Sequence, residues 1–217
     1  MEDFASQVDG VSALAEPARR ALYLYVVAQP GPVSRDQAAE GTSLPRHTAK
    51  FHLDKLVEEG LLDTESRRLF GRRGPGAGRP SKLYRRSARQ LAVSLPPRHY
   101  DLAGQILAAA VDDAARAGGS VLAAVERAAE AAGRRLGAAA PDDPVVATLA
   151  ACGYEPRPDE TGVVLANCPF HALARDHTEL VCGMNLHLVT ALLDERGAAQ
   201  RAVLEPGSDR CCVRLTS

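Results

Sequence analysis

Five cysteines carry the most distinctive chemistry of this sequence, and all of them lie in its carboxy-terminal third. Thirteen residues separate Cys168 from Cys182, and 28 residues separate Cys182 from the adjacent pair Cys211 and Cys212. An odd number of cysteines in a chain with no recognisable export signal argues against a disulfide framework. The spacing therefore favours thiolate chemistry or metal binding, with His171, three residues after Cys168, as a further candidate ligand.

The residues by themselves leave several chemistries open. Zinc would accept two or three thiolates together with His171 or His177, although the short paired spacing of structural zinc sites is absent. Metal-free thiols are a second alternative. A thiol enzyme that pairs Cys168 with His171 is a third, but no orienting group or oxyanion donor is recognisable. Cys152 lies outside the spacing pattern, and we expect it to be an ordinary buried cysteine.

A second set of residues could bind a polyanion. Residues 45–98 hold 13 basic and 5 acidic side chains, a net charge of +8, whereas residues 1–44 and 99–217 have net charges of −3 and −6. A basic block of this kind is typical of a surface that neutralises nucleic-acid phosphates and releases their counterions. The alternative is a solvated, charged loop.

Within this block, a helix expected from Pro45 to Glu59 has a polar side that could enter the major groove of DNA. Its candidate base-reading residues are Arg46, His47, Thr48, Lys50 and Phe51. Arginine and lysine donate to guanine, and threonine or phenylalanine can contact a thymine methyl group. Alternatively, Arg46 and Lys50 contact only phosphates. A glycine-rich loop adds a candidate phosphate clamp made of Arg72, Arg73, Arg79 and Lys82.

The elements that must position these side chains can be predicted from local patterns. Pro17 suits the first turn of a helix that ends at the breaker 29–32. Ser34 and Gln37 form a capping box that starts a short second helix. The helix from Pro45 to Glu59 follows, and its apolar stripe consists of Ala49, Leu53, Leu56 and Val57. Three such helices, followed by a hairpin with a long glycine-rich tip, predict a winged helix-turn-helix.

The stretches LPRHTAKFHLDKLVEEGLL and GRPSKLY in this region resemble the winged-helix regulators of the ArsR-like class. The resemblance covers about residues 11–88. It implies a DNA-binding domain whose third helix reads double-stranded DNA.

The rest of the chain predicts an α+β architecture in two parts. Residues 93–140 are alanine-rich and helical in pattern, broken at Gly118-Gly119 and at Gly137, and we expect a connector and dimerisation region. These helices could equally cover only their own domain. The remaining elements are expected as helices at 145–151, 169–176 and 178–195 and strands at 154–158, 162–166, 202–204 and 211–215. The expected domains are therefore 1–92, a winged helix-turn-helix; 93–140, a central helical connector and dimerisation segment; and 141–217, a small cysteine-containing α+β domain.

The runs NCPFH and VCGMN and the terminal cysteine pair resemble the sensor domain of the SufR family of iron-sulfur-responsive regulators. By this resemblance Cys168, Cys182 and one of Cys211 or Cys212 hold a 4Fe-4S or 2Fe-2S cluster. A histidine, the neighbouring cysteine or a small molecule would be the fourth ligand. Alternation along the expected last strand places Cys211 on the apolar face and favours it over Cys212.

We therefore interpret the chain as a homodimeric transcription regulator, with repression the expected mode, that binds a palindromic operator under the control of an iron–sulfur cluster. A zinc-stabilised or small-molecule-responsive regulator is the alternative, and a thiol enzyme is a more remote one. No apolar run is long enough for a membrane span, and the acidic start lacks the features of a signal peptide. We expect a cytoplasmic protein with no membrane partner.

Overall fold

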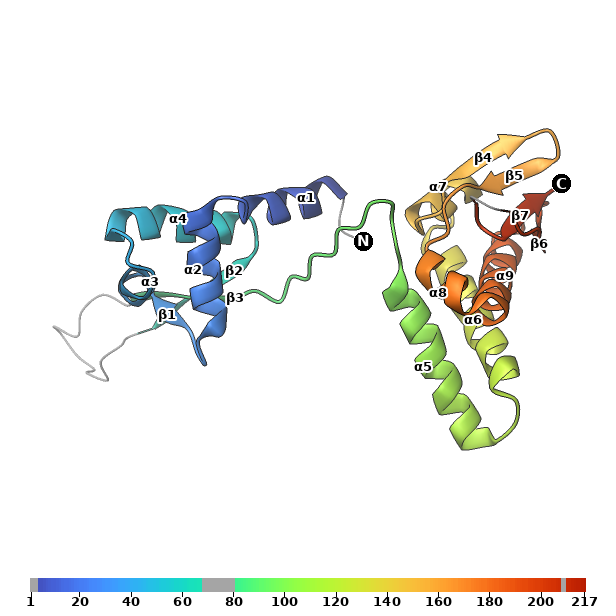
Figure 1. Ribbon diagram of the computed structural model, residues 1–217, viewed down its shortest axis with the longest axis horizontal. Helices are drawn as coiled ribbons and strands as arrows, with labels where there is room; N and C mark the ends of the chain where they lie inside the picture. The colour runs from blue at the N-terminus through green and yellow to red at the C-terminus, as the bar shows by residue number, and fades with distance from the viewer. Residues whose placement is uncertain (1–3, 68–80, 208–209) are drawn as a thin grey trace. The chain divides into compact units, whose positions relative to one another are not determined.

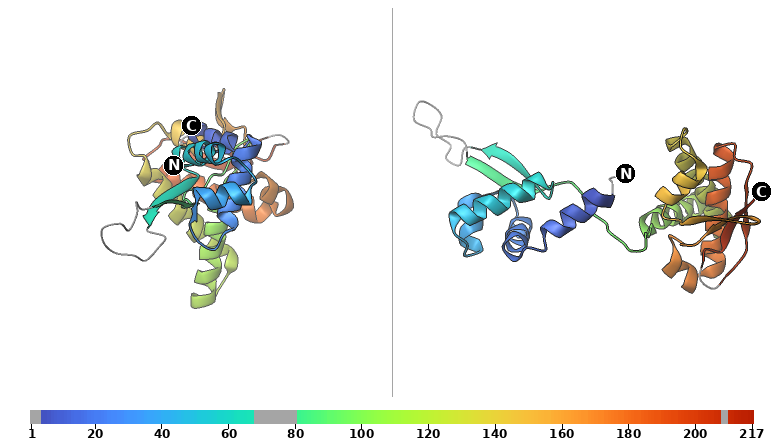
Figure 2. Two further views of the ribbon diagram at one scale, coloured as in Figure 1. Left: turned by 90° about the vertical axis from the view of Figure 1, so that its left-hand side faces the viewer. Right: turned by 90° about the horizontal axis from the view of Figure 1, so that it is seen from above.

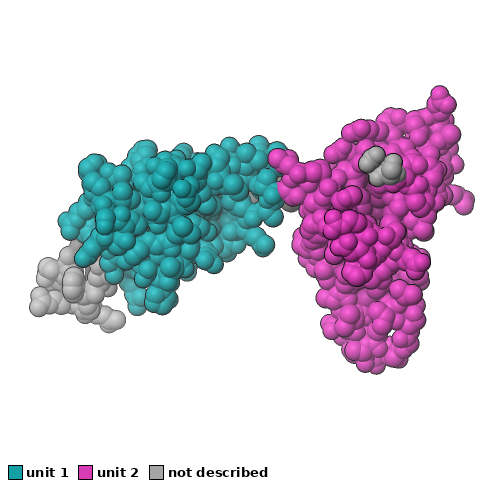
Figure 3. Space-filling view, in the orientation of Figure 1, with its two compact units in different colours: residues 1–93 teal, residues 94–217 magenta. Residues whose placement is uncertain are grey.

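A computed structural model describes residues 4–67, 81–207 and 210–217 of the protein. The chain divides into unit 1, residues 1–93, and unit 2, residues 94–217, each with its own hydrophobic core (Figures 1 and 3). Because each unit buries its own apolar side chains, both have the character of domains. In the described part of the chain, every helix is too short or too polar to span a bilayer.

The described residues of unit 1 include four helices, and local rules account for several of their ends. They are α1 (Phe4–Ala13), α2 (Pro17–Ala28), α3 (Arg35–Gly41) and α4 (Arg46–Glu58). Glu16 caps α2, since its carboxylate accepts hydrogen bonds from the N–H groups of Ala18 and Arg19. Ser34 and Gln37 form the predicted capping box of α3, with bonds of 3.2 and 2.9 Å. The three predicted helices are confirmed, whereas α1 was not predicted.

A three-stranded antiparallel sheet completes unit 1. Its strands are β1 (Val33–Ser34), β2 (Leu62–Arg67) and β3 (Ser81–Arg86), in the order β1-β3-β2. In the β2–β3 hairpin Leu62 pairs with Arg86 and Arg67 pairs with Ser81. The predicted hairpin is therefore present. Residues 68–80, which contain Arg72, Arg73 and Arg79 and were predicted to form its tip, lie outside the described residues.

The core of unit 1 forms where the apolar stripe of α4 meets α2 and β3. Leu22 from α2, Leu53 and Leu56 from α4, and Tyr84 from β3 are almost fully buried. The chain leaves α4 through Gly60, whose φ of 69° lies in the left-handed region that favours glycine. The stripe therefore faces inward, as predicted, and the opposite side of α4 remains accessible to solvent.

The described residues of unit 2 form five helices and one antiparallel sheet (Figure 2). The helices are α5 (Tyr100–Ala117), α6 (Val121–Ala139), α7 (Val145–Ala151), α8 (His171–Asp176) and α9 (Thr178–Glu195). The strands are β4 (Pro156–Asp159), β5 (Gly162–Leu165), β6 (Arg201–Leu204) and β7 (Val213–Thr216), in the order β4-β5-β7-β6. The mixed helix and sheet composition agrees with the predicted α+β class.

Helices α6 and α9 pack closely because α6 carries glycine where the two helices meet (Figure 1). A Cβ atom at Gly133 would lie 2.2 Å from the carbonyl oxygen of Leu188, and one at Gly137 would lie 2.9 Å from Glu195. The prediction of a helix break at Gly137 was wrong. The helix continues through it, since the residue serves close approach rather than chain reversal.

The alanine-rich face of α6 is used inside unit 2. Ala124, Ala129 and Ala132 are buried in the same core as residues of α9 and β7. Residues 93–140, expected as a connector, therefore share a hydrophobic core with the cysteine-containing region. Dimerisation stays a prediction, and it would use exposed side chains such as Val111 and Leu122 rather than these alanines.

Substitution of Gly133 by alanine is expected to destabilise unit 2 by about 1–3 kcal/mol, because the added methyl group collides with backbone of α9. Gly104 in α5 is the matched control, since a Cβ there meets nothing within 4 Å. Its replacement by alanine should raise the free energy of unfolding by about 0.5–1 kcal/mol. Urea denaturation followed by circular dichroism measures both changes, and equal stability of the two variants would contradict the close approach of α6 to α9.

Candidate functional site

Four thiols meet in unit 2, and Cys168, Cys182, Cys211 and Cys212 are called the thiol cluster below. Cys168 lies in the loop between β5 and α8, Cys182 lies near the start of α9, and the last two cysteines directly precede β7. In each of the pairs Cys168 and Cys211, Cys211 and Cys212, and Cys212 and Cys182, one thiol lies close enough to the other to shift its pKa. Three segments that are distant in sequence thus bring their sulfur atoms together.

Two predicted boundaries next to these cysteines were wrong. Helix α8 begins at His171 rather than Pro169, because residues 169–170 form a turn, so Cys168 is not an N-cap residue. The backbone N–H of Phe170 lies near its sulfur and lowers the pKa of the thiol. Strand β7 begins at Val213, so alternation along the strand does not select between Cys211 and Cys212. Both cysteines belong to the thiol cluster.

The surroundings of Cys168, Cys182 and Cys211 favour protonated sulfurs. The hydrogen bond with Cys211 and burial raise the pKa of Cys168 well above its usual range. For Cys211, the hydrogen bond with Cys168 lowers the pKa, but the bond with Cys212 and burial outweigh it and raise the pKa to about 12. Burial raises the pKa of Cys182, although its bond with Cys212 acts in the opposite direction. A metal ion bound here would have to displace thiol protons.

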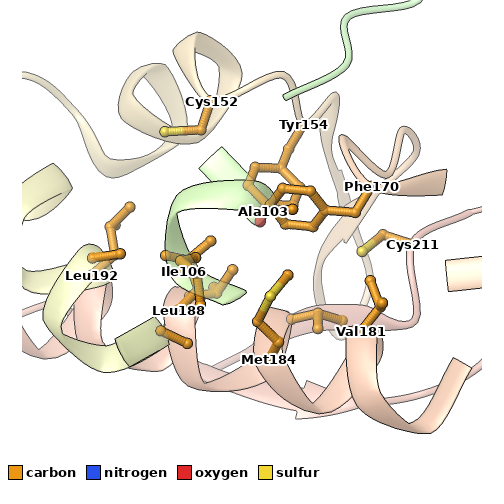
Figure 4. Close-up of a cluster of buried hydrophobic side chains, with 14 of the residues drawn as sticks. Ala103, Ile106, Cys152, Tyr154, Phe170, Val181, Met184, Leu188, Leu192 and Cys211 are labelled. Carbon is orange, nitrogen blue, oxygen red and sulfur yellow. The ribbon is translucent and has the colours of Figure 1, made fainter. Parts of the chain in front are cut away.

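A buried polar pair holds Cys211 in place. The Asn185 side-chain Nδ2 lies 3.1 Å from the Cys211 sulfur, and the Tyr154 hydroxyl donates to the Asn185 Oδ1. All three residues are buried, and Figure 4 shows Cys211 and Tyr154 in the core that contains Phe170 and Val181. Sequence reasoning missed both polar residues, although Asn185 follows Cys182 by three positions within the VCGMN run.

The donor set of the thiol cluster suits thiolate-bound iron or zinc. Among the described residues, no three cysteine, histidine or acidic side chains already stand in a metal-coordinating arrangement. His171 and His177 are exposed at the two ends of α8, and Cys152 is buried beside Tyr154 with its pKa raised to about 11 by burial. The roles assigned to these three residues stay predictions.

In unit 1, α4 exposes the residues predicted to read DNA. Arg46, His47, Lys50 and Phe51 are exposed, and Thr48 is partly buried. The Arg46 side chain is 74% exposed and Phe51 is 67% exposed. A helix with this accessible face, preceded by a short helix and a tight turn, has the form of one that enters a major groove.

Acidic side chains also lie on this face. Asp36 lies 3.4 Å from the Arg46 guanidinium and 3.2 Å from that of Arg35. Asp54 lies 2.7 Å from the Lys82 ammonium. Arg35, Asp36, Asp54 and Lys82 line a cavity of about 420 Å³, together with Ser34, Lys50, Ser81 and Tyr84. Lys82 would have to exchange its partner Asp54 for a phosphate in order to act as the predicted clamp.

The ion pair between Asp54 and Lys82 is built into the domain. Burial raises the pKa of the Asp54 carboxyl, but hydrogen bonds from Lys82 and from the Tyr84 hydroxyl outweigh it, so the pKa lies below its usual value. Tyr84 joins the pair at 3.1 Å and is itself almost fully buried. Asp54 thereby connects α4 to β3.

Comparison with protein families finds a match for the region that contains α2, α3 and α4. Residues 14–65 match the family described as a helix-turn-helix domain. The match begins just before α2 and ends within β2, so it contains the three predicted helices. The chain thus carries a domain of the type found in DNA-binding transcription regulators. No curated protein matches the chain.

Comparison with solved structures adds little to this assignment. A match is human N-acetylserotonin methyltransferase in complex with SAM, at 14% sequence identity and a TM-score of 0.24. It covers 88% of this chain, which spans about half, 46%, of that structure. At this TM-score the likeness supports no statement about fold or activity.

One residue of the helix-turn-helix domain was missed in the sequence analysis. Arg35 opens α3, lines the same cavity as Lys50, and has a side chain that is 43% exposed. The sequence could have indicated this residue, because Arg35 directly follows the capping residue Ser34 and therefore lies in the first turn of α3.

Proposed function

We propose that this chain is a DNA-binding transcription regulator, expected to be a repressor, whose operator affinity is controlled by an iron–sulfur cluster on Cys168, Cys182 and one or both of Cys211 and Cys212. The observation that carries the proposal is the convergence of four cysteines in a chain that also has a helix-turn-helix domain.

The DNA-binding part rests on charge and exposure. Arg46 and Lys50 extend from the accessible face of α4, and Arg35 adds a third cation beside them. In a homodimer, two such helices would contact the half-sites of a palindromic operator about one helical turn apart. The distance between the two recognition helices is then the quantity that a sensor can change.

The sensing part rests on how the thiol cluster is built. Its ligands come from the loop before α8, from α9 and from the segment before β7. When bound, an iron–sulfur cluster would supply iron that responds to redox conditions or to iron supply. The cysteines would connect these three segments only while it is present, which couples ligand binding to the order of unit 2.

Zinc is the second candidate, because the same thiolates would accept it. A thiol enzyme is less well supported, since an activated cysteine needs a lowered pKa and the pKa of Cys168 is raised. In addition, the expected base His171 is exposed.

Anaerobic purification and reconstitution with iron and sulfide test the proposal. The absorption spectrum and the iron, sulfide and zinc contents identify what the thiols bind. DNA selected from a random pool then allows the affinities of the loaded and metal-depleted proteins to be compared. A colourless protein with stoichiometric zinc would replace the iron–sulfur assignment with a zinc-stabilised regulator, and the absence of any selected sequence would contradict the regulatory role.

DNA affinity is expected to fall steeply with salt, with a slope of log affinity against log salt of about −0.9 for each phosphate contact. Replacement of both Arg72 and Arg73 by alanine should make the slope shallower by about one unit for each phosphate that is no longer neutralised. Arg175→Ala is the control, since this arginine lies on α8 in unit 2. Fluorescence anisotropy over a series of salt concentrations measures the slopes, and binding insensitive to salt would contradict the role of the basic block.

A further inference from the structure

The segment that joins the two units along the chain is fastened to the loop that carries Cys168. The Arg98 guanidinium donates to the carbonyl oxygen of Cys168 at 2.8 Å and to the side-chain oxygen of Asn167. The backbone N–H of His99 donates to the carbonyl oxygen of Pro169 at 3.1 Å. Residues 97–99 thus contact three consecutive residues of the cysteine loop.

Asn167 makes this attachment specific. Its Nδ2 donates to the carbonyl oxygens of Pro97 at 3.0 Å and Gly153 at 2.6 Å, while its Oδ1 accepts from Arg98. The side chain is 7% exposed, and exchanging its nitrogen and oxygen would place an acceptor against two carbonyl groups. A buried amide with all its main bonding positions in use has a single stable orientation.

The turn at Gly153 lies against the same segment. Gly153 has a φ of 80°, and a Cβ atom there would lie 2.7 Å from the His99 ring and 3.3 Å from Pro97. There is therefore little space for the segment to move while the Cys168 loop keeps its shape. Residues Pro97, Arg98, His99 and Asn167 are called the clasp below.

We propose that the clasp transmits the state of Cys168 to the connection between the two units, with Arg98 as the positioning residue. This inference rests on the proposed function, because it requires that Cys168 is a ligand. A metal bond at the Cys168 sulfur restrains the loop whose carbonyl groups and Asn167 hold residues 97–99. Loss of that bond lets the loop move, and the charge-assisted bonds of Arg98 move with it.

The clasp stands next to the point where the chain enters unit 2. The unit boundary lies after Val93, and α5 begins at Tyr100. The Tyr100 hydroxyl also accepts a hydrogen bond at 3.4 Å from the N–H of Ala172, beyond the same loop. A change in the Cys168 loop therefore reaches the start of α5 and the linker together.

The test compares Arg98→Ala with wild type and with a control variant, Arg175→Ala. Arg175 is an exposed residue of α8 that forms an ion pair with its neighbour Asp176. Arg98→Lys is the second variant, since it keeps the charge but loses the forked geometry. Arg98 is only half-buried, so both variants should fold, and thermal melting checks this. Each protein is prepared with and without reconstituted iron and sulfide.

Three readouts are recorded: iron content, the ratio of DNA affinities of loaded and depleted protein, and amide hydrogen exchange of the peptide that contains His99. Wild type and Arg175→Ala should show a ratio in the range of about 5- to 150-fold that is typical of coupled sites, and slower exchange at His99 when loaded. Arg98→Ala should bind iron normally. Its ratio of DNA affinities should fall toward 1, and amide exchange of the His99 peptide should no longer depend on iron. Arg98→Lys should give an intermediate ratio.

Failure of the clasp and failure of the proposed function give different results. If Arg98→Ala binds iron and keeps the wild-type ratio, the clasp is not the route of coupling, while the proposed function stands. If Arg98→Ala fails to bind iron, Arg98 supports the site itself, and the transmission role is overturned. If wild type binds iron but shows neither a change in DNA affinity nor a change in exchange at His99, the proposed function and the clasp both fail.

Discussion

Serine in place of Cys168 or Cys182 is expected to abolish the visible chromophore of the anaerobically reconstituted protein. Serine is a poor substitute for a thiolate that binds iron. Both cysteines are buried within the thiol cluster, where a serine would leave no thiolate in their place. Iron and sulfide content and the absorption spectrum measure the loss, which should be nearly complete.

Cys152→Ser is the matched control, because Cys152 is also buried but lies outside the thiol cluster, beside Tyr154. Its chromophore should equal that of wild type. Separate Cys211→Ser and Cys212→Ser variants distinguish a site with four thiolates, in which both lose the chromophore, from one with three, in which only one does. If all four single variants kept the wild-type spectrum, the thiol cluster would not be the metal site.

Alanine at Arg46 or Lys50 is expected to lower discrimination between the selected operator and a mutated operator by about 1–3 kcal/mol, if the residue makes a bidentate contact to a base. Both side chains are exposed on α4 and lie off its buried stripe, so the fold should be kept. Competition binding with both DNA sequences measures the discrimination. A uniform loss of affinity for both sequences would identify a phosphate contact instead.

Lys55→Ala is the control for this pair, since Lys55 lies on the same helix but is paired with Glu58 and Glu59 at its carboxy-terminal end. Removing the Lys55 side chain should change DNA affinity, and discrimination between the two DNA sequences, by no more than the contribution of a surface ion pair, about 0–1 kcal/mol. If Lys55→Ala and Lys50→Ala behaved alike, the first turns of α4 would not be the reading surface.

Local signals in the sequence determined the elements of the helix-turn-helix domain and most of those in unit 2. The capping box at Ser34 and the stripe through Leu53 specified α3 and α4, because caps and helical periodicity act over a few residues. Val145–Ala151 and Thr178–Glu195 were predicted with the bounds that the structure has. The spacing of the cysteines also indicated thiol chemistry, since the residue types themselves limit it.

Tertiary structure decided what depends on distant partners. Helix α1 was not predicted; the Arg89 side chain bonds to Ser6 at its start, and Gly10 packs against Leu91, so its position depends on residues about 80 places away in the sequence. The clasp joins residues 97–99 to 167–169 in the same way.

The pairing of the four thiols is likewise a tertiary property. Alternation along an expected strand selected Cys211 alone, whereas the strand begins only at Val213 and Cys212 contacts Cys182 on α9. Likewise Gly137 looked like a helix breaker, but α9 lies so close that only a residue without a side chain fits there. Sequence patterns determine which residues share a face of one element, but contacts between elements follow from packing, which no local pattern encodes.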